Sequence, residues 1–235
     1  MATELQVRLT GLSAPGQFVD WAQPFADLES CWNSCASPEF LLWLAARACT
    51  TTEERRAVVS CLAELTRCAE RGRQHANPPV ERAASAAETW IRSGASLDDL
   101  LAAERDALDA AERAALVAAA ESTRARMLYR SVPRGRHASF GTNRVLGALA
   151  DWRKADQAQR LALAAAGTAR AAAEAARADA LRSPGSWEAR VSESAAYVVS
   201  ALAHSQPTGR GDKGEKAARK AARLIRRRLP CPRLD

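Results

Sequence analysis

Residues 37–70 read SPEFLLWLAARACTTTEERRAVVSCLAELTRCAE, and this stretch decides the fold class of the chain. It contains two helix starts in succession. Ser37 precedes Pro38 and Glu39, and a threonine at 51 or 52 precedes two glutamates, which are patterns typical of helix N-termini. The second segment then carries apolar residues at the 3.6-residue spacing of a helix, namely Val58, Leu62, Leu65 and Ala69.

The rest of the 235-residue chain has the same helical character. Alanine, the best helix former, supplies an unusual share of the apolar residues, and runs rich in β-branched and aromatic residues are missing. We therefore predict an all-α fold of about eight helices, in a bundle or a helical-repeat-like stack. We expect an extended lead-in over 1–17, an all-helical domain over 18–205 whose first helix spans about 24–35, and a C-terminal segment over 206–235.

The C-terminal segment carries the net charge. The whole chain has a formal charge of +7, and residues 206–235 hold ten basic and three acidic residues, so this segment alone accounts for all of it. We expect a flexible linker over 206–211 and a basic amphipathic helix over about 212–229. Its cationic face consists of Lys216, Arg219, Lys220, Arg223, Arg226 and Arg227.

Three interpretations of this helix are open. It can dock its alanine-rich face on the rest of the protein, contact a protein partner, or bind the phosphates of nucleic acid. The helix lacks the Trp and Phe that favour membrane insertion and base stacking. The contact residues predicted for the second and third interpretations are the six cations named above.

The cysteines and tryptophans of the first third of the chain also have alternatives. Cys31 and Cys35 share one helix face, and Cys61 and Cys68 share another, so a crossing of the two helices could hold zinc. Free cysteine among tryptophan and leucine is more typical of a packed core. We favour core packing and predict no metal site. Trp21 and Trp187, near the ends of elements, are candidates for an exposed anchor.

We find no motif for catalysis or cofactor binding. The chain lacks a phosphate-binding glycine loop, a serine elbow and a clustered histidine pattern. It also shows no secretory signal and no apolar run long enough to span a membrane. We therefore expect a non-enzymatic, cofactor-free protein in the cytoplasm, where its six cysteines stay reduced.

One stretch, about residues 28–120, resembles a known family, and its first part carries the motifs. These are Trp32-x2-Cys35-x2-Pro38-x2-Leu41-Leu42-Trp43-Leu44-Ala45, then Arg55-Arg56-x-Val58-Val59, Cys61 and Cys68-Ala69, followed by alanine-rich helices. The stretch is similar to immunity family number five of bacterial polymorphic-toxin systems. The resemblance implies an all-helical protein that neutralises a cognate toxin, with Trp32, Cys35, Pro38, Trp43, Cys61 and Cys68 as its family-signature core.

Two features depart from the family. Ala36 and Ser37 follow Cys35 where the family has an acid, and the basic tail is unexpected. Because an inhibitor of a nuclease toxin presents acidic surface to a basic cleft, the cationic tail argues against that target. The leading hypothesis is an immunity-like protein that occludes a protein partner. The alternatives are a polyanion-binding accessory protein acting through the tail, or a helical scaffold subunit.

Overall fold

The computed structural model describes residues 2–71, 77–94, 96–131, 138–181, 187–205 and 213–233. Side chains are described throughout these ranges except at 138–141, 179–181, 204–205 and 213. Every regular element in this part of the chain is an α-helix, which confirms the predicted fold class. The predicted linker over 206–211 lies outside the described residues.

The N-terminal region corrects the sequence prediction, because residues 1–17 are largely helical. α1 spans Glu4–Gly11 and α2 spans Gly16–Ala22, which brings the described helices to ten instead of about eight. Thr3 forms a capping box: its hydroxyl accepts from the Gln6 main-chain N–H at 3.2 Å, and its own N–H donates to Gln6 Oε1 at 3.0 Å. The Thr-x-x-Gln pattern in the sequence is typical of a helix N-terminus.

Of the next three helices, α4 and α5 begin where the sequence predicts. α3 spans Leu28–Ser34 behind Asp27, so it starts four residues later than the predicted residue 24. α4 spans Pro38–Arg47 behind Ser37, and α5 spans Thr52–Glu70 behind Thr51. The Thr51 hydroxyl and the Glu54 carboxylate cap each other's main-chain N–H groups, as the sequence of residues 37–70 predicts.

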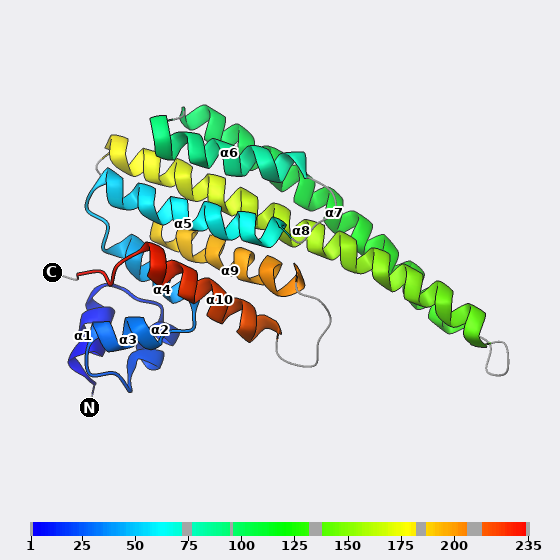
Figure 1. Cartoon of the computed structure of the whole chain (residues 1–235), viewed down its shortest axis with the longest axis horizontal. Coiled ribbons are helices and arrows are strands. Elements are labelled where there is room, and N and C mark those ends of the chain that lie inside the picture. Colours follow the sequence, from blue (N-terminus) through cyan, green and yellow to red (C-terminus); the bar gives the residue numbers. More distant parts are fainter. Residues whose placement is uncertain are drawn as a thin grey trace.

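Five longer helices complete the fold. α6 spans Pro78–Ser93, α7 spans Leu97–Ser131, α8 spans Ala138–Leu181, α9 spans Trp187–Ser205 and α10 spans Lys213–Arg228. α7 and α8 run antiparallel as the longest pair (Figure 1). α6 packs on both of them, α5 and α9 pack on α8, and α10 packs on α9, α4 and α5.

Small residues let α5, α8 and α9 approach closely. Thr66 and Thr168 share a buried hydrogen bond of 2.9 Å between α5 and α8. A Cβ added at Gly167 of α8 would lie only 2.8 Å from Ser194 Oγ of α9. At this separation the helices exclude larger side chains, so the alanine run of α8 forms a tight core.

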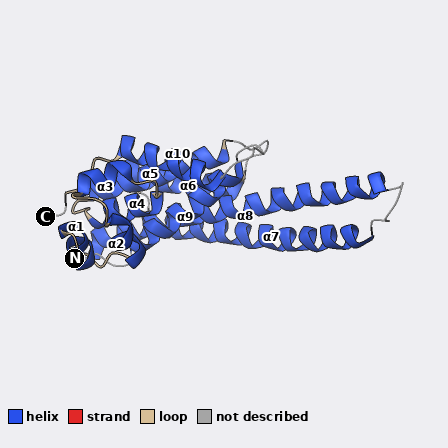
Figure 2. Cartoon of the chain, turned by 90° about the horizontal axis from the view of Figure 1, so that it is seen from below, coloured by secondary structure: helices blue, strands red, loops and turns tan. Residues whose placement is uncertain are grey.

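The α7–α8 pair extends well beyond the other helices (Figures 1 and 2). The contiguous core of the protein includes Ala111 of α7 and Leu161 of α8. Seam residues farther out, such as Ala118, Ala125 and Val145, are buried but lie apart from that core. We call residues 116–131 and 142–155 the distal hairpin, and residues 97–115 and 156–181 the proximal half of the pair.

Candidate functional site: two cationic surfaces

α10 is held on the body of the protein by its small apolar face. Ala217, Ala221, Ala222 and Ile225 are fully buried, and Leu229 just beyond the helix is buried as well. Their neighbours are α9, α4 and α5. The helix therefore docks its alanine-rich face, which is the first of the three interpretations of the sequence.

Two arginines tie α10 to the helices beneath it. Arg226 donates from Nη1 to the main-chain oxygen of Cys35 at 2.5 Å and to that of Trp32 at 3.3 Å. Arg228 pairs with Glu64 of α5, with 2.7 Å between Nε and Oε2. Arg226 therefore serves an internal contact, unlike the other five cations predicted to face a partner.

Those five cations, Lys216, Arg219, Lys220, Arg223 and Arg227, are exposed. Arg219 forms an ion pair with Glu215 one turn earlier on the same helix. A shallow hollow of about 500 Å³ lies between α5 and α10. It is lined by Glu64, Lys220, Arg223, Leu224, Arg227 and Arg228. The arrangement presents an open cationic surface, with the Glu64 carboxylate at the edge of the hollow.

The second surface, the distal hairpin, was not identified from the sequence. Large apolar side chains lie exposed on it: Leu116 is 67% exposed, Met127 66% and Tyr129 74%. Leu116 and Met127 lie on the side of α7 opposite the buried Ala118 and Ala125, because nine residues complete two and a half helical turns. Tyr129 follows Ala118 by about three whole turns, so it lies on another side of α7 than Leu116 and Met127.

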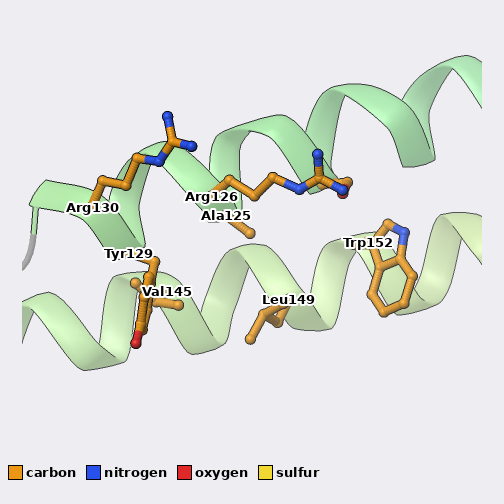
Figure 3. Close-up of a pocket in the computed structure, with 8 residues that line it drawn as sticks. Ala125, Arg126, Tyr129, Arg130, Val145, Leu149 and Trp152 are labelled. Carbon is orange, nitrogen blue, oxygen red and sulfur yellow. The ribbon is translucent and has the colours of Figure 1, made fainter.

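A groove runs between the two helices of the distal hairpin (Figure 3). It has a volume of about 440 Å³. Figure 3 shows Tyr129 beside Val145 at one end and Trp152 at the other, with the side chains of Arg126 and Arg130 extending from α7. The lining residues, which all come from α7 and α8, are Ser122, Ala125, Arg126, Tyr129, Arg130, Val145, Leu149 and Trp152.

The distal hairpin is also cationic. Its two ranges contain six basic and two acidic residues, a net charge of +4. Both acids form ion pairs within their own helix: Glu121 with Arg124 at 3.3 Å, and Asp151 with Lys154 at 3.6 Å. The structure thus gathers positive charge outside the tail, which the sequence analysis treated as the sole charged region.

The family-signature residues lie inside the protein. Trp32, Cys35, Pro38, Trp43 and Cys61 are buried, and Cys68 is half-buried. Burial raises the pKa of the Cys31 and Cys61 thiols to about 12 and that of Cys35 to about 11, so these thiols stay protonated. In the described part of the chain, His, Cys, Asp and Glu side chains form no group of three that could hold a metal.

The two candidate anchor tryptophans also have internal roles. Trp187 is buried at the start of α9. Trp21 of α2 packs against Phe40 of α4, with ring centroids 5.5 Å apart, and against Phe25 at 4.8 Å. Trp187 is therefore no exposed anchor, and Trp21 is half-buried against the two phenylalanines.

No protein-family model, curated protein or solved structure matches this chain. Among the described helices, none is both long enough and apolar enough to cross a membrane.

Proposed function

We propose that this chain is a non-enzymatic binding protein of the cytoplasm that occludes a protein partner, contacting it through the distal hairpin. One observation carries the proposal: Leu116, Met127 and Tyr129 are each about two-thirds exposed or more on a projecting helix pair. Burying such side chains against a partner removes their apolar surface from water, which drives association.

The immunity-like role extends this proposal to a cognate toxin as the partner. The resemblance over residues 28–120 supports it at the level of the sequence alone. Because the family-signature residues are buried, their role here is to pack α3, α4 and α5 together. The helical bundle would then serve as a rigid base, and the projecting hairpin would do the blocking.

The experiment is co-expression with the product of the adjacent gene, followed by co-purification and a test of growth rescue. The variant pair Leu116→Ser/Met127→Ser removes apolar side chains that are 67% and 66% exposed. We expect it to weaken the complex at least about tenfold, while leaving thermal unfolding unchanged.

Val7→Ser is the matched control, because Val7 of α1 is 62% exposed and lies outside the hairpin. It should bind within about twofold of the parent chain. Failure of both co-purification and rescue would remove the toxin as the partner. A complex that tolerates Leu116→Ser/Met127→Ser would remove the distal hairpin as the contact surface.

The exposed cations of α10 favour a second candidate function, polyanion binding. Lys220, Arg223 and Arg227 surround one hollow, and Arg228 beside them pairs with Glu64. Duplex DNA at low salt is the probe, and binding should weaken steeply as salt rises. Lys220→Ala/Arg223→Ala should reduce the salt dependence by about two counterions. A full-length protein that ignores DNA at low salt would exclude this function.

A further inference from the structure

In the proximal half of the pair, α9 packs on α8. Arg160 of α8 donates from Nη1 to Ser200 Oγ of α9 at 2.6 Å. Leu108 of α7, Leu163 of α8 and Tyr197 of α9 line one hollow, which places the three helices together there. This side of α8 therefore holds another helix in the proximal half, with α7 lining the same hollow.

The distal groove lies on the same side, farther along the pair. Ser122 and Arg126 follow Leu108 by about four and five helical turns. Leu149 and Val145 precede Leu163 by the same numbers of turns. Whole turns return a side chain to the same face, so the groove continues the line of α9 beyond its end at Ser205.

The floor of the groove is apolar. Ala125 and Val145 are buried between the two helices, and Leu149 and Trp152 are half-buried. Small residues such as Ala125 leave space for the ridge of a neighbouring helix, while Leu149 and Trp152 supply contact area. Val145 to Trp152 spans about 10 Å, which matches roughly two turns of an added helix.

The charges at the edge specify the chemistry of that helix. Arg126 and Arg130 are exposed beside the groove, and Glu121 and Asp151 are paired with Arg124 and Lys154. Carboxylates on an incoming helix would complement the two arginines. A second copy of the same hairpin would bring its own net charge of +4 and be repelled.

We propose that the groove binds an acidic amphipathic α-helix of a partner protein, laid in line with α9. Its apolar residues at i, i+3 or i+4, and i+7 would contact Ala125, Leu149 and Trp152, while its carboxylates pair with Arg126 and Arg130. This inference rests on the proposed function and names the part of the partner that is recognised.

The test uses a fluorescein-labelled helical peptide of about 14 residues, with a leucine and alanine face flanked by glutamates. A second peptide carries lysine in place of each glutamate. Fluorescence anisotropy with the full chain should show saturable binding of the acidic peptide and none of the lysine peptide. Arg126→Glu/Arg130→Glu should weaken binding at least about tenfold, and Tyr129→Ser about threefold or more.

Arg113→Glu/Arg153→Glu is the matched control, because it makes the same charge change at exposed arginines that do not line the groove. It should bind within about twofold of the parent chain. Equal losses in both double variants, or equal binding of both peptides, would overturn the inference. So would single-stranded DNA that displaces the acidic peptide, or dimerisation in light scattering that Tyr129→Ser abolishes.

The same variants separate this inference from the proposed function. If the co-expressed partner is lost with Leu116→Ser/Met127→Ser but retained with Arg126→Glu/Arg130→Glu, the hairpin binds the partner and the groove does not. If the acidic peptide binds in the groove while the co-expressed protein never co-purifies, the groove inference stands and the toxin is removed as the partner.

Discussion

Both halves of the α7–α8 pair are rich in alanine, but they have different surroundings. In the proximal half, α5, α6 and α9 pack around the pair, and the core includes Ala111 and Leu161. In the distal half, each helix packs chiefly on the other through Ala118, Ala125 and Val145. An alanine seam holds two helices together yet covers little apolar area, so several larger side chains of the distal half stay exposed.

The strongest test of this contrast is hydrogen exchange. Residues 145–155 pack on one neighbouring helix, whereas residues 161–175 of the same helix lie among several (Figure 1). Local opening of the distal hairpin should therefore cost much less free energy than opening of the proximal half. We expect distal amides to exchange at least about a hundredfold faster, as measured by mass spectrometry.

Residues 57–66 of α5, whose apolar side is part of the core, provide the internal reference and should exchange as slowly as 161–175. Equal protection over 145–155 and 161–175 would mean that the whole pair unfolds as one unit. The distal hairpin would then be part of the body of the protein.

Two leucines of α8 make the same comparison by substitution. Leu161 is 1% exposed in the core and Leu146 is 57% exposed on the distal hairpin. Leu161→Ala should lower the free energy of unfolding by about 2–5 kcal/mol, because it leaves a cavity. Leu146→Ala should change it by less than about 0.5 kcal/mol in urea titrations. Similar losses at both positions would contradict the contrast.

The fold class and most helix starts could be predicted from the sequence, since capping residues act locally. Ser37 and Thr51 cap α4 and α5 as expected, and the α10 alanine face is buried as its spacing indicates. The buried side of α7 was harder to predict. The leucine spacing favours a row of Leu97, Leu101, Leu108, Ala111 and Ala115. The buried row is instead Leu100, Ala103, Ala107, Ala111, Ala118 and Ala125.

The physical reason is that alanine occurs on every side of α7 and therefore does not mark a face. Leu108 is 43% exposed, whereas Glu104 is buried beside Arg170, its ion-pair partner on α8. A partner so distant in the sequence cannot be predicted from a local pattern. The distal hairpin could not be located either, because its exposure depends on where α6 and α9 end. A usable signal was that Leu116 and Met127 lie opposite a continuous row of small residues.

Ion pairs, like the apolar contacts, are more buried in the proximal half than in the distal half. Arg170 of α8 bridges Glu104 of α7 at 2.9 Å and Glu174 at 3.1 Å, and Glu104 is largely buried. Arg170→Met would leave that carboxylate without its cation and should cost roughly 2–3 kcal/mol. Arg153→Met, at an exposed arginine of the distal hairpin, should cost less than about 0.5 kcal/mol. If urea titrations show that the two variants lose equal unfolding free energy, the distal arginine is as strongly paired as the proximal one.

The smallest expected effect is a pH dependence confined to the body of the protein. Arg67 of α5 holds the Glu88 carboxylate of α6 through two hydrogen bonds, one of them 2.9 Å from Nη2 to Oε2, and this lowers the pKa of Glu88 below its ordinary value of 4.5. A lowered pKa stabilises the fold at pH values above 4.5, and that contribution is lost as the pH falls through the ordinary value toward the folded one. Between about pH 6 and pH 3 the parent chain should therefore lose about 0.5–1 kcal/mol more unfolding free energy than Glu88→Gln. The effect is small because both side chains of the pair are partly exposed.

Arg67→Met should show the same reduced loss in urea titrations. The double variant should show no further reduction, because the same contact is removed in each case. If Glu88→Gln loses as much stability on acidification as the parent chain, the acid sensitivity of the protein comes from carboxylates other than Glu88.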